Sequence, residues 1–260
     1  MEISLDCLTF IQLEPAEQIR VAAAAGYSCV SVWVVPPGMP GGTVVAAADV
    51  PMLQELLAET GLAVANLECF NINVEEDVIA SYADALRIGA ALGGRAATAI
   101  DYGDFRDDLP ERFAAFVDLA ASYGIRARFE PIASGNHRTL TEAAELIEAS
   151  GAEAGVVFDV LHFVRTGADF GHLSGPGAHL IDHVQLCDGP AAVHDNGVDF
   201  EGACERLALG EGAFPLPEIV AALPAGVQYA IEVPSLLAIE RGIAPGERAA
   251  DLIQRAQRLL

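Results

Sequence analysis

The chain contains no lysine, and all 14 of its basic residues are arginines, which face 37 acidic residues and leave a formal net charge of −23. The absence of lysine excludes mechanisms that need a lysine Schiff base, including pyridoxal phosphate enzymes and imine-forming aldolases. So acidic a chain repels phosphate backbones and anionic lipid surfaces. We therefore expect neither a nucleic acid nor a membrane as partner.

Cysteine motifs and long apolar runs are also missing. The five cysteines are odd in number and have no CxxC spacing, so neither a disulfide framework nor a thiolate zinc cluster is indicated. The start, MEISLDCLTF, lacks a basic region followed by a long apolar stretch, and no later run of 18 uncharged apolar residues occurs. These features predict a cytoplasmic protein.

What the chain does have is a repeated local pattern: an alanine-rich amphipathic helix, a glycine, and an apolar strand, as in AAAAGYSCVSVWV and LAASYGIRARFE. Glycine can take the left-handed conformation that ends a helix, and continuous apolar strands suit a parallel sheet covered on both faces. The pattern predicts strands near residues 2–9, 28–35, 62–69, 95–100, 125–130, 154–160, 180–187 and 227–233. It predicts helices over residues 15–25, 46–60, 74–92, 110–123, 141–149, 215–223 and 245–259.

Eight βα units in 260 residues, of which 52% are hydrophobic, predict an α/β fold of the (β/α)8 TIM barrel type, as a single domain over residues 1–260. An open doubly wound sheet is the alternative, but no GxGxxG follows the first strand. The sixth crossover, RTGADFGHLSGPGAH, is too short and too rich in glycine for a long helix. Two long connections, residues 36–49 and 188–212, follow strand ends and would form lids or substrate walls, although a flexible insertion explains the first equally well.

Four strand-like runs in the second half each end on a metal-capable oxygen side chain: Glu130, Asp159, Gln185 and Glu232. The carboxyl ends of parallel barrel strands share one face, so these groups would converge. Carboxylate and amide oxygens suit one hard divalent ion, Mn²⁺ or Mg²⁺. His183 precedes Gln185 by two residues, would point to the same face, and is the alternative third ligand.

Such a site predicts proton transfer next to a carbonyl. A divalent ion that chelates adjacent hydroxyl and carbonyl oxygens acidifies the C–H bond between them and stabilises the enediolate. Glu130 and Glu232 would flank the substrate and serve as acid/base groups as well as ligands. The predicted reaction is the interconversion of an aldose and a ketose, or inversion of a centre beside a ketone.

The segments FEPIASGN, FDVLHFVRTGAD, HVQLCDGP and RLALGEGAFPLPEIV, with YAIEVPS after them, resemble the xylose isomerase-like barrels of sugar isomerases and epimerases. The resemblance covers the whole chain in layout, with its specific motifs between residues 126 and 235. It implies one divalent metal held by Glu130, Asp159, Gln185 and Glu232. Many relatives have histidine at the third position; Gln185 is similar to hydroxypyruvate isomerase-like members, and its neutral amide oxygen suits Mn²⁺ or Mg²⁺ better than zinc.

The same resemblance implies substrate contacts. His162, three residues after Asp159, would contact a substrate oxygen as a catalytic group; a buried histidine that caps the sixth loop is the alternative. Arg206, in R-x-x-x-G-E-G, would bind a substrate hydroxyl or carboxylate. Glu211 would hydrogen-bond to Arg206 or to the ligand; the alternative is that the glycines on either side of Glu211 only form a turn.

Two further residues are predicted to bind substrate on the basis of their residue types and positions, without the resemblance. Trp33 would line a sugar pocket or pack in the core, and Glu68, an acid among apolar residues, would be paired or lie in the mouth. For Arg165, also near the predicted mouth, a surface ion pair is at least as good an explanation.

The predicted function is a metal-dependent isomerase or epimerase of a small sugar, ketose or hydroxy keto acid. One alternative is a lyase or dehydratase acting on an inosose, a dehydroshikimate or a 3-keto-glycoside, with an extra acid such as Asp195 supplied by residues 189–212. Another is a catalytically silent small-molecule-binding or partner subunit. The scarcity of cations favours a neutral polyhydroxy substrate or a monocarboxylate over a sugar phosphate, and the resemblance implies a homo-oligomer, a dimer or a tetramer.

Overall fold

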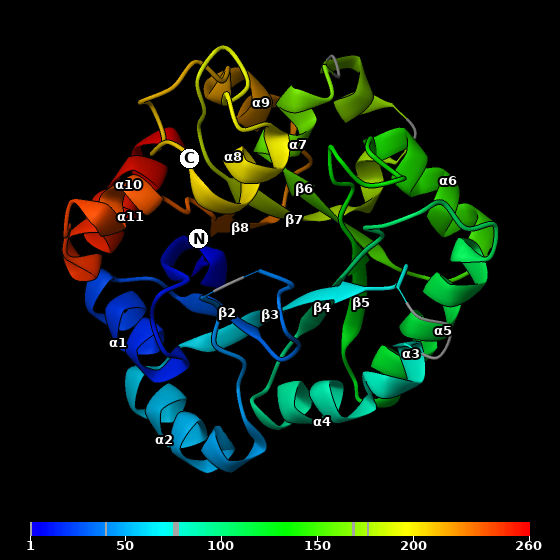
Figure 1. Ribbon diagram of the computed structural model, residues 1–260, viewed down its shortest axis with the longest axis horizontal. Helices are drawn as coiled ribbons and strands as arrows, with labels where there is room; N and C mark the ends of the chain where they lie inside the picture. The colour runs from blue at the N-terminus through cyan, green and yellow to red at the C-terminus, as the bar shows by residue number, and fades with distance from the viewer. Residues whose placement is uncertain (1, 40, 75–77, 168–169, 176) are drawn as a thin grey trace.

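Eight parallel strands form a closed barrel in which each strand pairs with its neighbours in chain order and β8 pairs with β1 (Figure 1). The computed structural model describes residues 2–39, 41–74, 78–167, 170–175 and 177–260. The strands are β1 (Ile3–Leu5), β2 (Cys29–Trp33), β3 (Ala63–Asn71), β4 (Ala96–Ile100), β5 (Arg126–Phe129), β6 (Gly155–Asp159), β7 (Ile181–Leu186) and β8 (Gln228–Ile231). The predicted TIM barrel is confirmed, and the pairing of β1 with β8 excludes the open sheet.

Helices form a ring around the barrel (Figure 1). They are α1 (Pro15–Ala25), α2 (Val50–Thr60), α3 (Val78–Ser81), α4 (Ala83–Ala91), α5 (Leu109–Ser122), α6 (Leu140–Ser150), α7 (Val160–Arg165), α8 (Val198–Cys204), α9 (Leu216–Ala222), α10 (Leu236–Glu240) and α11 (Pro245–Leu259). Gly26 and Gly61 end α1 and α2 at φ of 93° and 73°, the left-handed region that the glycine pattern predicted. No helix in the described ranges is long and apolar enough to cross a membrane.

The differences from the predicted elements have local causes. Strand β1 ends at Leu5 rather than near residue 9, because the Asp6 side chain accepts a hydrogen bond from the Leu8 amide at 3.0 Å and caps a 3-10 turn over Cys7–Phe10. The predicted helix over 74–92 is divided into α3 and α4, and its residues 75–77 lie outside the described ranges.

The second half of the chain differs mainly in its crossovers. The sixth crossover holds the short α7 and two 3-10 turns, Phe170–Ser174 and Ala178–Leu180, in place of a long helix, as its composition predicted. The short helices α8 and α10 were not predicted. Helix α8 lies within the long connection after β7, over the carboxyl ends of the strands, and therefore belongs to the site.

The barrel interior beneath the site is polar as well as apolar. Asn66 of β3 donates to Thr98 of β4 at 2.5 Å and to the Glu68 carboxylate at 2.6 Å. Arg128 of β5 donates to Asp182 at 2.6 Å and approaches the Asn66 amide oxygen at 3.4 Å. This buried network ties β3, β4, β5 and β7 together and holds Glu68 from below.

We expect Gly89→Ala to destabilise the barrel. A Cβ at Gly89 of α4 would lie 3.0 Å from Leu67 Cδ2 and closer still to its Cδ1. Leu67 is fully buried in β3, so the overlap should cost about 1–3 kcal/mol, more than the roughly 1 kcal/mol that alanine contributes to a helix over glycine. Urea denaturation measures the difference. Gly246→Ala in α11 is the control, because a Cβ at that position would have nothing within 4 Å, and equal stabilities for the two variants would contradict the close packing of α4 on β3.

Candidate active site

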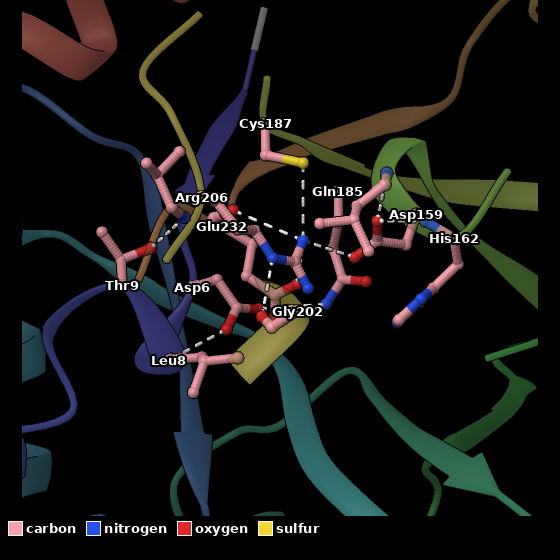
Figure 2. A network of polar contacts seen from close by, with 12 residues as sticks. Asp6, Leu8, Thr9, Asp159, His162, Gln185, Cys187, Gly202, Arg206 and Glu232 are labelled. Carbon is pink, nitrogen blue, oxygen red and sulfur yellow. Dashed lines mark hydrogen bonds and ion pairs between the residues drawn. The ribbon is translucent and has the colours of Figure 1, made fainter. Parts of the chain in front are cut away.

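The four predicted oxygen ligands gather where the carboxyl ends of the last four strands meet. Glu130 follows β5, Asp159 ends β6, Gln185 lies in β7 and Glu232 follows β8. All four are buried, with exposed fractions of 7%, 2%, 1% and 6%. Figure 2 shows Asp159, Gln185 and Glu232 around one side chain from the long connection after β7, that of Arg206.

Arg206 forms the centre of the polar network. Its Nη1 lies 2.7 Å from Asp159 Oδ2 and 2.9 Å from Glu232 Oε2, and its Nε donates to the Gly202 carbonyl of α8 at 2.8 Å (Figure 2). Burial by itself lowers the pKa of an arginine, but the carboxylates of Asp159 and Glu232 outweigh it and raise the pKa of Arg206 well above its usual value. Arg206 is therefore a permanent positive charge between two ligand candidates.

Asp159 is held by both of its oxygens. Its Oδ1 caps α7 by accepting from the amides of Leu161 at 2.6 Å and His162 at 3.3 Å, and its Oδ2 pairs with Arg206. Burial acts to raise the pKa of Asp159, but the Arg206 guanidinium prevails and lowers it to about 2. This carboxylate stays ionised.

Glu130 and His162 complete a cluster with Asp159. One ligand atom from each of these three residues lies within 4.8 Å of the other two, and His162 Nε2 is 3.8 Å from Glu130 Oε1. Burial lowers the pKa of His162 to about 4, so the imidazole is neutral at pH 7. Burial, and then the Asp159 charge, raise the pKa of Glu130 well above its usual value.

Gln185 leaves one oxygen atom without a donor. The Gln185 amide nitrogen lies 3.2 Å from Glu232 Oε1 and 3.4 Å from Asp6 Oδ2, while its buried Oε1 has no hydrogen-bond partner among the described residues. Glu232 Oε2 is paired with the Arg206 guanidinium at 2.9 Å. Buried acceptors are normally satisfied, and a cation would satisfy the Gln185 oxygen. The donor set of three carboxylates and one amide therefore fits a hard divalent ion.

His183, the alternative third ligand, lies one layer deeper in the barrel. Its Nδ1 is 3.3 Å from the Gln228 side-chain oxygen. His183 and Gln228 lie opposite each other in β7 and β8, two residues before the opposed residues Gln185 and Ala230. Burial, and then the nearby Arg128 charge, lower the pKa of His183 well below its usual value. The His183 side chain thus bonds to Gln228 rather than to the acids of the site, so the geometry favours Gln185.

A cavity of about 690 Å³ opens above these groups. Four of the predicted substrate-binding residues line it, namely Trp33, Glu68, His162 and Arg206, together with Glu130 and Glu232. Asp159 and Gln185 do not line this cavity. Asp159 contacts the lining residue Arg206, and Gln185 contacts the lining residue Glu232.

Two residues near the mouth have other partners. The structure does not bring Glu211 to the cavity, because its carboxylate pairs with Arg255 of α11 at 2.7 Å. Arg165 pairs with the buried Glu201 at 2.8 Å and stacks on the Phe214 ring, as a structural ion pair.

Sequence reasoning missed two acids of the cavity. Asp6, fully buried after β1, accepts a hydrogen bond from Ser31 Oγ at 3.0 Å, and its Oδ2 lies 3.4 Å from the Gln185 amide nitrogen. The acid at the end of the apolar run ISLD is the sequence signal by which Asp6 could have been found. Asp199 lines the cavity from α8, near Tyr102. Glu68, which was predicted, has its pKa raised well above its usual value by burial and then by the charges of Asp6 and Glu130.

Comparison with known proteins gives the family of this barrel. A family model described as xylose isomerase-like TIM barrel matches residues 19–254. The chain belongs to the xylose isomerase-like TIM barrel family. The resemblance predicted from the sequence motifs is thereby confirmed. No curated protein sequence matches the chain.

Solved structures similar to this family member share its fold. A xylose isomerase domain-containing protein of Salmonella typhimurium LT2 superposes with a TM-score of 0.82 at 19% identity, over 100% of this chain and 97% of that one. The IolI protein with a bound zinc atom gives 0.79 at 15% identity, over 100% and 96%. A D-allulose 3-epimerase from Methylomonas sp. gives 0.73 at 17% identity, over 100% and 98%. At these identities the likeness establishes the fold alone.

We expect Arg206→Gln to destabilise the protein by about 3–5 kcal/mol, because it leaves Asp159 and Glu232 buried without their countercharge. Divalent cations should recover part of that loss by neutralising the same carboxylates. Thermal unfolding with and without Mn²⁺ measures both effects. Arg87→Gln is the control, since the pair of Arg87 with Asp84 is exposed and should be worth less than about 1 kcal/mol. Equal losses in the two variants would contradict the coupling of the buried groups.

Proposed function

We propose that this protein is a divalent-metal-dependent isomerase or epimerase of a polyhydroxy carbonyl compound. The observation that carries the proposal is that Glu130 and Glu232, from strands β5 and β8, line one cavity with the neutral His162 and the charged Arg206. Membership of the xylose isomerase-like family supports it, as does the fold shared with a D-allulose 3-epimerase.

The proposed metal ligands are Glu130, Asp159, Gln185 and Glu232, and the partnerless oxygen atom of Gln185 supports this assignment. When bound, a divalent ion supplies Lewis-acid polarisation of the substrate carbonyl. We propose Mn²⁺ or Mg²⁺ because all four donors are hard oxygens. The zinc in the IolI structure, which shares this fold, supports metal use in such a barrel.

Proton transfer falls to the two glutamates. Without a bound cation, burial raises the pKa of each carboxyl above its usual value. A divalent ion at the site would favour the ionised carboxylates, which can then accept a substrate proton. One glutamate takes the proton from the hydroxyl-bearing carbon beside the substrate carbonyl. If the other glutamate returns a proton to the opposite face of the same carbon, the product is an epimer. If a proton is returned to the former carbonyl carbon and the hydroxyl proton passes to the former carbonyl oxygen, the product is an isomer.

His162 and Arg206 stabilise the charge that develops on the substrate oxygens. Both line the cavity, and His162 Nδ1 has no hydrogen-bond partner among the described residues. A neutral imidazole can donate a hydrogen bond to an enediolate oxygen without neutralising the glutamates beside it. The Arg206 guanidinium, fixed by Asp159 and Gly202, contributes a preorganised positive charge.

Elimination is the second candidate, and one observation favours it. Asp199 of α8 lines the cavity, so an acid from the long connection faces the substrate space. Such a group can protonate a leaving group β to the carbonyl after the same first step. The extra acid in this connection is thus Asp199, whereas Asp195, proposed from the sequence, is exposed and does not line the cavity.

We expect metal-dependent exchange of a substrate C–H proton with D₂O, followed by NMR over a panel of ketoses, inososes and hydroxy keto acids. Glu130→Gln and Glu232→Gln should each slow the exchange by about 10²–10⁴-fold, because each removes an acid/base group. Glu211→Gln, outside the cavity, is the matched control and should exchange as the wild type does. Appearance of an enone in place of an isomer would assign elimination, and undiminished exchange in both glutamine variants would overturn the proposal.

Metal binding distinguishes Gln185 from His183. We expect Gln185→Ala to weaken Mn²⁺ binding by at least about tenfold in calorimetric titration, and Gln185→His to raise the affinity for zinc relative to Mn²⁺, since imidazole suits zinc. His183→Gln should retain Mn²⁺ binding because His183 contacts Gln228 rather than the acids. Loss of binding in His183→Gln with none in Gln185→Ala would reverse the assignment.

A further inference from the structure

The cavity has two chemically different sides. The ionisable groups Glu130, His162, Arg206 and Glu232 come from the β5 to β8 half of the barrel, and Asp6 and Glu68 lie at the cavity floor after β1 and in β3. The opposite side, over β1 to β5, is formed largely by apolar side chains. Six of them are Leu8, Met39, Val74, Ile100, Tyr102 and Ile132. Figure 1 shows strands β2 to β4 across the barrel from β6 to β8.

The six residues, here named the apolar wall, contribute apolar surface to the lining of the cavity. Each is half-buried or exposed, with Val74 at 46% and Tyr102 at 40%, whereas Glu130, Arg206 and Glu232 are buried. Apolar surface that faces a pocket gains free energy when a ligand removes it from water. The wall is therefore suited to cover an apolar group.

Polar groups on this side of the cavity already have partners. The Asn71 amide donates to the Tyr102 carbonyl at 2.8 Å and accepts from the backbone amides of Asn73 at 3.0 Å and Tyr102 at 3.1 Å. The Tyr102 hydroxyl lies near Ser134 and Asp199, which line the same cavity. Hydroxyl groups of a sugar placed against the wall would lose water without gaining equivalent bonds, which is unfavourable.

Size and charge limit the ligand further. A volume of about 690 Å³ lies within the roughly 300–1,000 Å³ that is typical of sites for drug-sized ligands, and a free monosaccharide would leave much of it to water. The acids Asp6, Glu68, Glu130, Asp199 and Glu232 line the cavity with Arg206 as the arginine among its lining residues. This excess of acidic over basic side chains disfavours the binding of phosphates and other anions.

We infer that the substrate is an uncharged glycoside-like molecule, in which a polyhydroxy carbonyl ring meets the glutamates and an aromatic group attached to it lies on the apolar wall. Aromatic substituents suit Tyr102 and Trp33 by ring contacts and Met39 by contact with its sulfur. The inference rests on the proposed function, because it names the substrate class of that same site.

The test compares phenyl and methyl glycosides of the same hexoses, with the 3-keto forms included, as ligands of the Mn²⁺-loaded protein. Trp33 lines the cavity and is the single tryptophan of the chain, so its fluorescence reports binding directly, with calorimetry as a second readout. For at least one hexose the phenyl glycoside should bind about 10–100-fold more tightly than the methyl glycoside.

Val74→Ser and Ile132→Ser together should remove most of that preference. Val193→Ser is the matched control, because Val193 is exposed to 45%, as Val74 is to 46%, but does not line the cavity. Equal affinities for phenyl and methyl glycosides, no measurable binding of any phenyl glycoside, or a preference that survives in the wall variant would each overturn the inference.

Glu130→Gln separates this inference from the proposed function. If the phenyl preference persists in this variant while proton exchange is lost, both stand. A phenyl preference with no proton exchange for any compound in the wild type supports the apolar wall and overturns the isomerase. Proton exchange of free sugars without a phenyl preference supports the isomerase and overturns the inference about the apolar wall.

Discussion

The arrangement of this site depends on one buried ion triad, in which the Arg206 guanidinium lies between Asp159 and Glu232. Charges removed from water are tolerated only with compensation, so the three side chains must stay together for the barrel mouth to be stable. The triad joins the end of β6, the end of β8 and the connection after β7, three segments distant in sequence. Its geometry therefore depends on the pairing of β6, β7 and β8 side by side, and it fixes the direction in which Arg206 and Glu232 face the cavity.

The connection that supplies Arg206 also shapes the cavity. Helix α8 precedes Arg206, and the Gly202 carbonyl in its last turn accepts the hydrogen bond from Arg206 Nε. The same helix places Asp199 at the cavity, which Tyr102, two residues beyond the end of β4, also lines. One short helix thus joins the charged side of the cavity to its apolar side, and changes in this connection would alter the cavity without altering the side chains at the strand ends.

Much of the fold was predictable, because glycine stops and apolar strands are local signals. The strand-end acids Glu130, Asp159 and Glu232 followed from the same reasoning, since parallel strands end on one face. What the sequence could not give depends on distant contacts or weak local signals. Glu211 pairs with Arg255 of α11, some distance away in the chain. Asp6 joins the site because β1 closes against β8. Helix α8 has only 7 residues, too few for a clear helical period.

A neutral side chain such as Gln185 at the third position is consistent with the charge balance of the site. The carboxylates of Glu130, Asp159 and Glu232 carry three negative charges when ionised, and a divalent cation with the Arg206 guanidinium would carry three positive charges, so these five groups would balance one another. The Asp6 carboxylate beside them accepts hydrogen bonds from Ser31 and from the Leu8 amide. A neutral amide leaves that sum unchanged, while its nitrogen contacts Glu232 and Asp6 and its oxygen remains free for the cation. Without the cation, protons must take its place, which agrees with the raised pKa of Glu130 and of Glu232. Cation binding and proton uptake at these glutamates are therefore competing ways to balance the same buried charge, so the affinity for the cation should rise as protons are released.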